Sequence, residues 1–491
     1  MNKDSNNTAS SREAAWREEL RNAMTARERT AIERVEMPHL APEQRVHSND
    51  EVNCGLSREQ AMREASRCLD CPDPQCVQGC PVGIDIPGFI KNIQRGDDAA
   101  AATVLRATSA LPAVCGRVCP QEKQCESRCI YNKMKKQPVA IGYLERYAAD
   151  AAATMPAAAP ATTPAADAAK IAVVGSGPAG LSFAGEMTRL GYAVTVYEAL
   201  HEIGGVLKYG IPEFRLPNSI VERELDGLRA AGVTFCKDTV IGKTLSYDDL
   251  IAAGFKGVFV ASGAGLPRFM GIPGENLIGV MSSNEYLTRV NLMGAARGGK
   301  TPVAVGKRVA VVGGGNTAMD SVRTARRLGA DEAMIVYRRS EAEMPARREE
   351  VMHAKEEGVT FMTLANPVEY LADDKGHVRA MRMQRMELGE PDAGGRRRPI
   401  AIPGAIDEIA VDEVIVSVGV SPNPLIPNSI SGLDITDRGT IAVADNLQSS
   451  IPLIFAGGDI VRGGATVILA MGDGRRAAAE MHKYLSAQAG N

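Results

Sequence analysis

The chain has 491 residues, of which 45% are hydrophobic, so it is long enough for about three domains with buried cores. Its formal net charge of -3 lacks the strong positive field typical of proteins that bind nucleic acid or anionic membranes. The N-terminus has no apolar core of the signal-peptide type, and no later run approaches the roughly 18 apolar residues of a membrane span. We therefore expect a cytoplasmic protein with neither nucleic acid nor membrane as a partner.

Residues 1–154 form the first expected domain, which is helical and rich in cysteine. The charged stretch Ser11–Glu36 predicts one or two surface helices, with Trp16 as a packing anchor, and Ile86–Leu105 also has a helical pattern. Nine of the ten cysteines fall between Cys54 and Cys129. In a reducing compartment this concentration indicates metal or cluster ligation rather than a disulfide framework.

The cysteine spacing favours iron-sulfur clusters over structural zinc. Zinc sites usually have two separated Cys-x2-Cys pairs, often with histidine, whereas this region has one such pair and two Cys-Pro ends. An iron-sulfur cluster can also serve as a redox relay, and a zinc ion cannot. The relevant positions are Cys68, Cys71, Cys76, Cys80-Pro81, Cys115, Cys119-Pro120, Cys125 and Cys129.

A linker and a dinucleotide-binding unit follow. Residues 155–169 are rich in Ala, Pro and Thr, a composition that buries little. Ile171–Glu198 then has the pattern of a strand, a glycine turn, a helix and a second strand that ends in an acid. Gly175, Gly177 and Gly180 have the G-x-G-x-x-G spacing that lets a pyrophosphate approach a helix N-terminus, and the acid can hydrogen-bond a ribose hydroxyl.

Val309–Arg339 repeats this pattern with Gly313, Gly315 and Ala318 in the turn. Its second strand ends in Arg338 and Arg339 instead of an acid. An arginine at this place suits the 2'-phosphate of NADP, which an acid would repel. The alternative is a pair of solvated surface arginines.

The C-terminal residues are expected to complete the first nucleotide domain. Gly257–Gly263 and Glu413–Gly419 are short strands that cross between two halves of a two-dinucleotide flavoprotein, and 389–399 is a hairpin tip or exposed loop. Asp459 and the helix N-terminus at Thr466 could hold a flavin. We therefore expect an FAD-binding domain from 170–293 and 426–491, with an NADPH-binding domain of 294–425 inserted in it.

Four further motifs carry a family resemblance: CGRVCP at 115–120, PVAIGYLERY at 138–147, YGIPEFRLP at 209–217 and GGGNTAMD at 313–320. With the cysteine spacing, they resemble the small (β) subunit of bacterial NADPH-dependent glutamate synthase. The same module is similar to the N-terminal half of dihydropyrimidine dehydrogenase and to the flavoprotein subunit of NADH-dependent reduced ferredoxin:NADP oxidoreductase. The resemblance implies an α/β protein with an N-terminal helical double-cluster domain and two Rossmann-like domains of the glutathione or adrenodoxin reductase type.

The resemblance also implies which residues bind the cofactors. Two 4Fe-4S clusters would be held by Cys68, Cys71, Cys76 and Cys129, and by Cys80, Cys119, Cys125 and a fourth, non-cysteine ligand at the position of Glu145. Cys115 is the alternative fourth ligand, and otherwise Cys54, Cys115 and Cys236 are plain buried thiols. FAD would lie against Val118, Gly175, Ser176, Gly177, Pro178, Glu198, Val206, Arg215, Asp459 and Thr466, and NADPH against Gly314, Gly315, Asn316, Thr317, Arg338 and Arg339, with Arg347 a weaker candidate.

These inferences predict an NADPH-linked oxidoreductase that passes electrons through FAD and two clusters to a partner. Hydride transfer needs positioning and exclusion of water, so we expect no proton-transferring catalytic residue. The expected partner is the large glutamate synthase subunit or another redox subunit, with ferredoxin as a further candidate. The rival functions are a flavoprotein subunit of an electron-bifurcating ferredoxin:NADP oxidoreductase and a non-catalytic assembly module that binds structural zinc.

Overall fold

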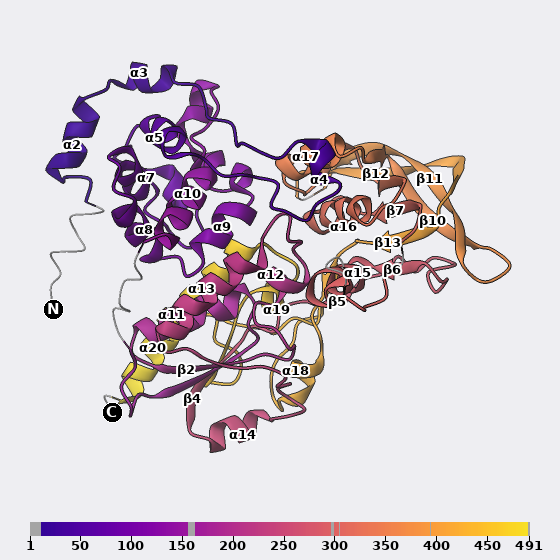
Figure 1. Cartoon of the computed structure of the whole chain (residues 1–491). Helices are drawn as coiled ribbons and strands as arrows, with labels where there is room; N and C mark the ends of the chain where they lie inside the picture. The colour runs from indigo at the N-terminus through magenta and orange to yellow at the C-terminus, as the bar shows by residue number, and fades with distance from the viewer. Residues whose placement is uncertain (1–10, 156–162, 296–298, 304, 393, 490–491) are drawn as a thin grey trace.

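The computed structural model describes residues 11–155, 163–295, 299–303, 305–392 and 394–489. A helical N-terminal domain and two α/β domains, each built on a parallel sheet, make up the molecule (Figure 1). The expected fold class is therefore confirmed. Residues 156–162 of the linker expected at 155–169 lie outside the described residues.

The helical domain is a set of short helices joined by tight turns. Trp16 is half-buried beneath Arg95, whose guanidinium carbon lies 4.0 Å from the ring centroid, so it packs as expected. The helices are α2 (Ala15–Asn22), α3 (Ala26–Ala31), α4 (Pro42–Arg45), α5 (Arg58–Ser66), α6 (Gln75–Gln78), α7 (Ile86–Gln94), α8 (Asp98–Arg106), α9 (Pro112–Val118) and α10 (Ile141–Ala153), with 3-10 turns η1 (Gln121–Lys123), η2 (Glu126–Arg128) and η3 (Ile130–Met134).

The helical pattern at 86–105 is divided between α7 and α8. Gly96 has a φ of +80°, a left-handed conformation that ends α7. Asp97 then starts α8, because its side chain accepts a hydrogen bond from the backbone N–H of Ala100 at 2.9 Å. The sequence pattern alone did not reveal this break.

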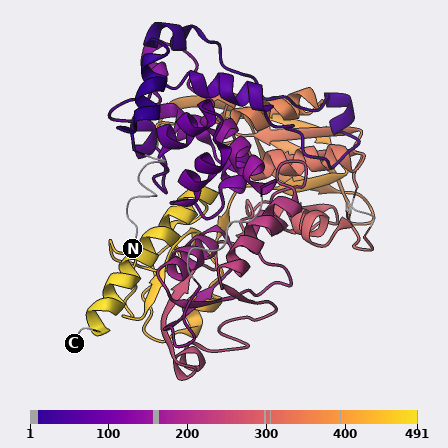
Figure 2. The ribbon, with the colours of Figure 1, turned by 60° about the vertical axis from the view of Figure 1, so that its left-hand side comes forward.

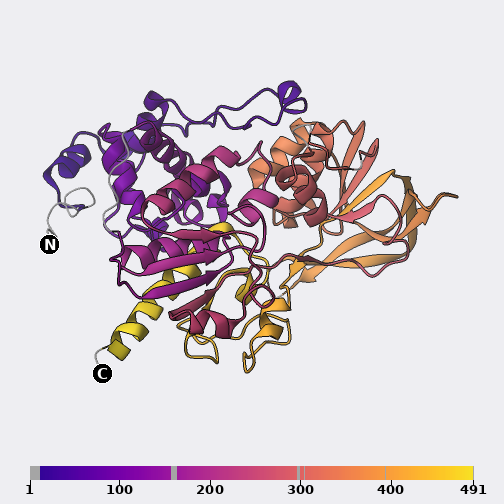
Figure 3. The same ribbon diagram turned by 60° about the horizontal axis from the view of Figure 1, so that its bottom comes forward.

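The first α/β domain has a parallel sheet in the order β15-β4-β1-β2-β3. Its C-terminal strand β15 pairs with β4, so the end of the chain completes this domain as expected. Helix α20 packs along α11 and lies against the sheet (Figure 3). The elements are β1 (Lys170–Val174), α11 (Pro178–Arg189), β2 (Ala193–Tyr197), α12 (Val206–Tyr209), α13 (Asn218–Ala230), β3 (Thr234–Cys236), α14 (Tyr247–Ala252), β4 (Phe255–Val260), α18 (Leu425–Ser429), β15 (Ile454–Ala456), α19 (Asp459–Arg462) and α20 (Val467–Ala489).

The second α/β domain has a parallel sheet in the order β6-β13-β7-β8-β9 and a separate antiparallel sheet β10-β11-β12. The short antiparallel pair of β5 (Leu266–Pro267) and β14 (Val420–Ser421) joins the two domains. The elements are β6 (Val280–Ser282), α15 (Ser283–Leu287), the π-turn η4 (Thr288–Leu292), β7 (Arg308–Val312), α16 (Asn316–Arg327), β8 (Glu332–Tyr337), η6 (Glu341–Glu343), α17 (Arg348–Glu356), β9 (Thr360–Thr363), β10 (Ala365–Ala372), β11 (Val378–Pro391), β12 (Arg397–Ala410) and β13 (Glu413–Val416).

The expected boundary at 293/294 needs a correction. Val280–Ser282 pairs in parallel with β13, and Tyr286, Leu287 and Val290 belong to the hydrophobic core under the second sheet. Residues 280–293 therefore pack with the second α/β domain, and the chain passes between the domains before β6. The hairpin tip expected at 389–399 agrees with the turn between β11 and β12.

The helical domain and the first α/β domain share one hydrophobic core. Phe89 and Val114 from the helical domain belong to the same buried cluster as Leu181 of α11 and Met471 of α20. Figure 2 shows α20 running beside the helical domain. The second α/β domain has cores of its own, so the helical and first α/β domains are packed as one unit.

Candidate functional site

One large cavity of about 1680 Å³ lies between the two α/β domains and reaches the helical domain. Both glycine turns border it, and Val118 and Pro120 of the helical domain form part of its wall. Every residue proposed above for FAD or NADPH lines this cavity, apart from the weaker candidate Arg347. The sequence had therefore selected residues that the fold brings together, and their individual roles remain predictions.

The first glycine turn leaves room for a ligand at one position and close packing at the others. A side chain on Gly175, which has a φ of +103°, would place its Cβ 2.5 Å from the carbonyl oxygen of Ala261. On Gly180 the Cβ would lie 2.0 Å from the oxygen of Gly175. A Cβ on Gly177 would meet nothing within 4 Å, so this glycine borders open space at the start of α11. This geometry fits a pyrophosphate at the helix N-terminus.

Glu198 stands at the end of β2 and is held by the glycine turn. Its Oε2 accepts hydrogen bonds from the backbone N–H of Ser176 at 3.0 Å and from the Ser176 hydroxyl at 2.5 Å. The N–H of Leu200 donates to Oε1 at 2.9 Å. A fixed, buried carboxylate at the edge of the cavity fits recognition of a ribose diol.

Asp459 lies on another wall of the same cavity. The backbone N–H of Ala465 donates to its Oδ1 at 3.0 Å. Burial raises the pKa of Asp459 to about 6, and the neighbouring carboxylate of Asp473 contributes in the same direction. The loop between α19 and α20 therefore presents a desolvated acid together with the N-terminus of a long helix, which fits the expected position of a flavin.

The second glycine turn has the same close packing. Gly313 has a φ of +147°, and a Cβ on Gly314 would lie 2.8 Å from the ring of Tyr337. Helix α16 begins at Asn316, whose Oδ1 accepts a hydrogen bond from the N–H of Arg347 at 2.8 Å. The turn lines the cavity at the start of α16, and a helix N-terminus at this place fits a dinucleotide pyrophosphate.

The two arginines after β8 differ in their surroundings. Arg339 is buried, donates from Nε to the carbonyl oxygen of Arg397 at 2.8 Å and pairs with Asp392 at 3.1 Å. Arg338 is exposed and makes no ion pair with the part of the chain that the structure describes. Arg338 therefore has its charge available in the cavity, while that of Arg339 is engaged by the β11–β12 hairpin. Arg396 of that hairpin also lines the cavity, and no motif in the sequence had indicated this position.

Two other arginines join the domains. Arg215 borders the cavity but pairs with Asp320 of α16 at 2.7 Å and with Glu350 of α17 at 3.3 Å. Arg347 lies outside the cavity wall, where its guanidinium donates to the carbonyl oxygen of Arg117 at 2.6 Å and to Gln121 at 3.1 Å. The Arg347 side chain contacts the helical domain here, and its role as an NADPH ligand stays a prediction.

One group of four thiols lies near the surface of the helical domain. We call Cys68, Cys71, Cys76 and Cys129 the outer thiol site. Burial raises the pKa of Cys76, and the proximity of Cys68, Cys129 and Cys71 raises it further. The influence of the other three thiols on the pKa of Cys76 indicates that the fold brings all four close together. Closely grouped sulfur ligands of this kind fit a cluster that would bind them as thiolates.

A second group lies deeper, and it consists of Cys80, Cys119, Cys125 and Glu145, which we call the inner site. Burial raises the pKa of Cys80 to about 11, and the Glu145 carboxyl contributes in the same direction. The Glu145 carboxyl also contributes to the raised pKa of the Cys119 and Cys125 thiols. The fold therefore gathers three thiols and one carboxyl, as the family pattern implies.

Glu145 has the burial and the unpartnered oxygen expected of a residue that could bind a metal. It lies on α10 and is buried, and its Oε1 has no hydrogen-bond partner in the described part of the chain. Burial raises its pKa to about 8, and the nearby buried Glu224 adds to the shift. A buried carboxyl without a partner costs free energy of about 1–3 kcal/mol, so a positive iron ion beside it would offset this cost.

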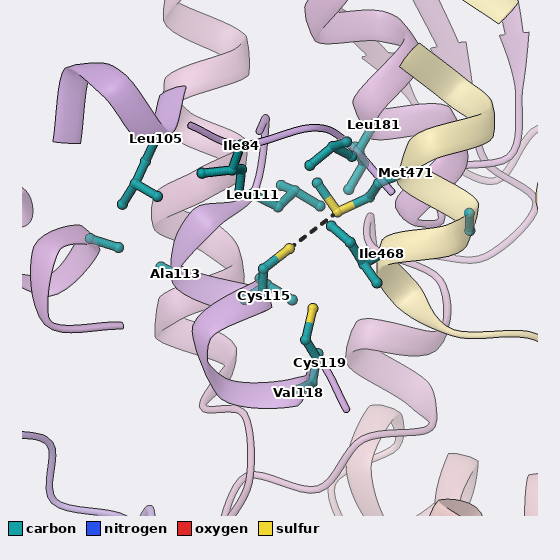
Figure 4. Packing of buried hydrophobic residues seen from close by; sticks show 14 of the residues in the cluster. Ile84, Leu105, Leu111, Ala113, Cys115, Val118, Cys119, Leu181, Ile468 and Met471 are labelled. Atoms are coloured by element: carbon teal, nitrogen blue, oxygen red, sulfur yellow. Dashed lines mark hydrogen bonds between the residues drawn. The ribbon is translucent and has the colours of Figure 1, made fainter. Parts of the chain in front are cut away.

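Cys115 lies one helical turn before Cys119 and beside the inner site, because Cys119, Glu145 and Cys80 all influence the pKa of its thiol. Its Sγ lies 3.4 Å from the Sδ of Met471, and Figure 4 shows it directed toward Leu111, Ile468 and Met471. These contacts make Cys115 a packed core thiol. Of the three cysteines expected to be plain buried thiols, Cys54 is exposed and Cys236 is half-buried, so that prediction was wrong for Cys54 and Cys236.

The inner site adjoins the cavity. Val118 and Pro120 flank Cys119 in sequence, and both line the cavity wall. Gln124, which precedes Cys125, donates to the Thr466 hydroxyl at 3.4 Å. A ligand of the first α/β domain would therefore lie close to the inner site, and the outer site would be the more remote of the two.

Comparison with known proteins matches two parts of the chain to two families. Residues 45–157 match the family described as dihydropyrimidine dehydrogenase domain II, 4Fe-4S cluster, and residues 169–474 match the family of pyridine nucleotide-disulphide oxidoreductases. The glutamate synthase [NADPH] small chain of Escherichia coli strain K12 is 37% identical over 438 residues, which cover 88% of this chain and 92% of that protein. The corresponding chain of Azospirillum brasilense is 37% identical over 448 residues, or 89% and 92%.

Other relatives extend beyond this module. The NADPH-Fe(3+) oxidoreductase subunit beta of Geobacter sulfurreducens is 38% identical over 445 residues, and the match covers 85% of this chain and 65% of that protein. Among solved structures, FprA from Mycobacterium tuberculosis in complex with NADPH has a TM-score of 0.57 at 21% identity and covers 66% of this chain and 86% of its own. That likeness supports the fold. No helix in the described residues has the length and apolar character to span a bilayer.

Proposed function

The chain belongs to the family of glutamate synthase [NADPH] small chains, and from this membership we propose that it is the electron-input subunit of a larger redox enzyme. It is an NADPH-dependent oxidoreductase of the flavin and iron-sulfur type, with a 4Fe-4S domain and a pyridine nucleotide domain. A flavin bound beside the first glycine turn would supply two-electron hydride chemistry, and clusters held by the thiol sites would supply one-electron transfer. Two clusters, at the inner and outer sites, complete the proposal.

The shared cavity carries this proposal. Its walls contain both glycine turns, so both dinucleotides would meet in one space. Val118 and Pro120 bring the Cys119 segment to the same wall. The chain's own contribution is therefore to bind and orient the two dinucleotides beside the inner site, and no side chain needs to transfer a proton.

The finer proposal concerns the partner. We propose the large subunit of a glutamate synthase, which would perform glutamine hydrolysis and 2-oxoglutarate reduction. Native pull-down from the source cells followed by mass spectrometry tests this directly. Recovery of a very large amidotransferase chain supports the proposal, whereas recovery of a small flavin and 2Fe-2S chain would support an electron-bifurcating enzyme instead.

Metal analysis of anaerobically purified protein tests the class of function. We expect iron and acid-labile sulfide together with one FAD per chain, and a visible spectrum of flavin and iron-sulfur type. Zinc in place of iron, with no bound flavin, would support a structural assembly module. This measurement is independent of which partner is recovered.

Arg338→Ala is expected to lower the use of NADPH about 10-fold or more, because a charge-assisted hydrogen bond to the 2'-phosphate is worth roughly 1.5–3 kcal/mol. Its exposed guanidinium has no ion-pair partner among the described residues, so the loss should fall on the phosphate alone. Steady-state kcat/KM for NADPH and for NADH measures the effect, and NADH use should hardly change.

Arg339→Ala is the matched comparison, because Arg339 holds the β11–β12 hairpin through Asp392 and the oxygen of Arg397. That variant should weaken both nucleotides. Equal losses for NADPH and NADH in Arg338→Ala would refute the assignment of its side chain to the 2'-phosphate.

A further inference from the structure

The two cysteine sites differ in how close they lie to the surface. Three of the four outer thiols, Cys71, Cys76 and Cys129, are partly exposed and Cys68 is buried, whereas at the inner site only Cys80 is partly exposed and the other three members are buried. The inner site adjoins the cavity, and the outer site does not line it. If electrons enter at the cavity, the outer site is where they leave the chain.

The segment that carries Cys129 is strongly basic. Residues 127–137 (SRCIYNKMKKQ), which we call the basic loop, contain Arg128, Lys133, Lys135 and Lys136 and no acidic residue. In a chain with a formal net charge of -3, this is a marked local excess of positive charge. All four basic side chains are exposed, and none forms an ion pair with the residues that the structure describes. The preceding acid, Glu126, is buried and paired with Arg34 at 2.9 Å, so it does not neutralise the loop.

The basic loop is a fixed surface. Tyr131 is buried, and its hydroxyl donates to the carbonyl oxygen of Arg67 at 2.7 Å. The backbone N–H of Lys136 donates a hydrogen bond to the carbonyl oxygen of Tyr131 at 3.0 Å, and Lys135 adopts a left-handed φ of 55° that closes this turn. The lysines therefore project from an anchored turn, which lowers the entropy cost of binding a partner.

The position of the basic loop suits a docking surface. The Nζ of Lys136 donates to the carbonyl oxygen of Thr30 on α3 at 2.5 Å, and α3 lies at the edge of the helical domain away from the sheet of the first α/β domain (Figure 1). Met134, between the lysines, is 41% exposed. An exposed methionine flanked by charged residues is typical of an interface that a partner covers.

We propose that the basic loop is the docking surface for an acidic one-electron carrier protein, which takes electrons from the outer site. This proposal rests on the proposed function. One NADPH supplies two electrons, so each turnover reduces two molecules of a one-electron carrier and releases NADP+ and one proton. Positive charge beside the outlet would steer the acidic partner and hold its redox centre near Cys129.

The test compares the wild-type holoenzyme with the triple variant Lys133→Gln, Lys135→Asn, Lys136→Gln. Asparagine is used at 135 because it tolerates the left-handed backbone. The probe is a purified plant-type 2Fe-2S ferredoxin, an acidic carrier, and its Kd is measured by isothermal titration calorimetry at low and high salt. We expect the triple variant to bind about tenfold more weakly and to lose most of the salt dependence, since several exposed charge pairs disappear together.

A control variant removes exposed lysines elsewhere: Lys243→Gln with Lys256→Gln, both on the first α/β domain. It should bind ferredoxin like the wild type. Carbodiimide cross-linking followed by peptide mapping gives a second readout that does not depend on turnover. We expect cross-links from Lys133, Lys135 or Lys136 to ferredoxin carboxylates, and cross-links confined to other lysines would overturn the proposal.

NADPH-dependent reduction of benzoquinone, a small neutral acceptor, separates the two proposals. Both variants should reduce it at the wild-type rate, because this reaction needs no protein docking. If the wild type reduces benzoquinone but the triple variant binds ferredoxin unchanged, or the wild type does not bind it, the docking proposal is wrong while the proposed function stands. If the wild type loaded with FAD does not oxidise NADPH with benzoquinone, the proposed function itself fails.

Discussion

Glu145→Ala is expected to lose one of two clusters and so to halve the iron content, while FAD and the outer cluster remain. The carboxylate is buried beside three thiols, and its Oε1 has no partner in the described chain, as expected of a metal ligand. Without it the inner cluster would keep only Cys80, Cys119 and Cys125. Iron and FAD analysis with low-temperature electron paramagnetic resonance measures the result.

Two further variants make this test specific. Glu145→Gln should retain the cluster with an altered potential, because the amide oxygen can still reach iron but carries no charge. Cys115→Ala should retain both clusters, since its sulfur packs against Met471 in the apolar core. A full iron complement and an unchanged spectrum in Glu145→Ala, with one cluster lost in Cys115→Ala, would show that the cysteine is the ligand.

Gly180→Ala is expected to abolish FAD binding and to destabilise the first α/β domain. The added Cβ would lie 2.0 Å from the backbone oxygen of Gly175, and neither α11 nor the turn can move away without losing the strand-helix packing. Overpacking of this kind costs about 1–3 kcal/mol or more. Thermal unfolding of the apoprotein should show a lower Tm, and the purified protein should lack flavin.

Gly177→Ala is the matched control for the role of the turn. Its Cβ would meet nothing within 4 Å, and its φ of -69° is open to any residue, so the apoprotein should keep the wild-type Tm. The methyl group would instead occupy the space where a pyrophosphate approaches, and FAD affinity should fall about 10-fold or more. Wild-type FAD affinity in this variant would show that the cofactor does not approach the turn at this glycine.

The sequence predicted the parts of the fold that local pattern determines. Strands β1 and β7 are β-branched runs, each followed by glycines and an amphipathic helix, so their positions could be predicted closely. The break between α7 and α8 was missed, because one left-handed glycine within a helical pattern is a weak signal. The placement of β6 was also missed, because a three-residue strand takes its sheet from tertiary pairing with β13.

The site shows the same limit. Cysteine and glycine spacing identified residues that converge, since their chemistry depends on residue type and interval. The role of an arginine is harder to predict from sequence, because its guanidinium can bind a phosphate, an acid or a carbonyl oxygen equally well. Arg347 is engaged by Arg117 and Gln121 of the helical domain, and Arg215 by Asp320, partners more than 100 residues away in sequence.

An anaerobic titration of the isolated chain with NADPH tests the central claim most directly. The account predicts that the flavin absorbance bleaches on addition of NADPH, and that samples frozen during the titration show the electron paramagnetic resonance signal of a reduced 4Fe-4S cluster, without any partner protein. Bleaching of the flavin with no cluster signal even in excess NADPH, in protein with its full iron content, would contradict transfer from the shared cavity to the thiol sites.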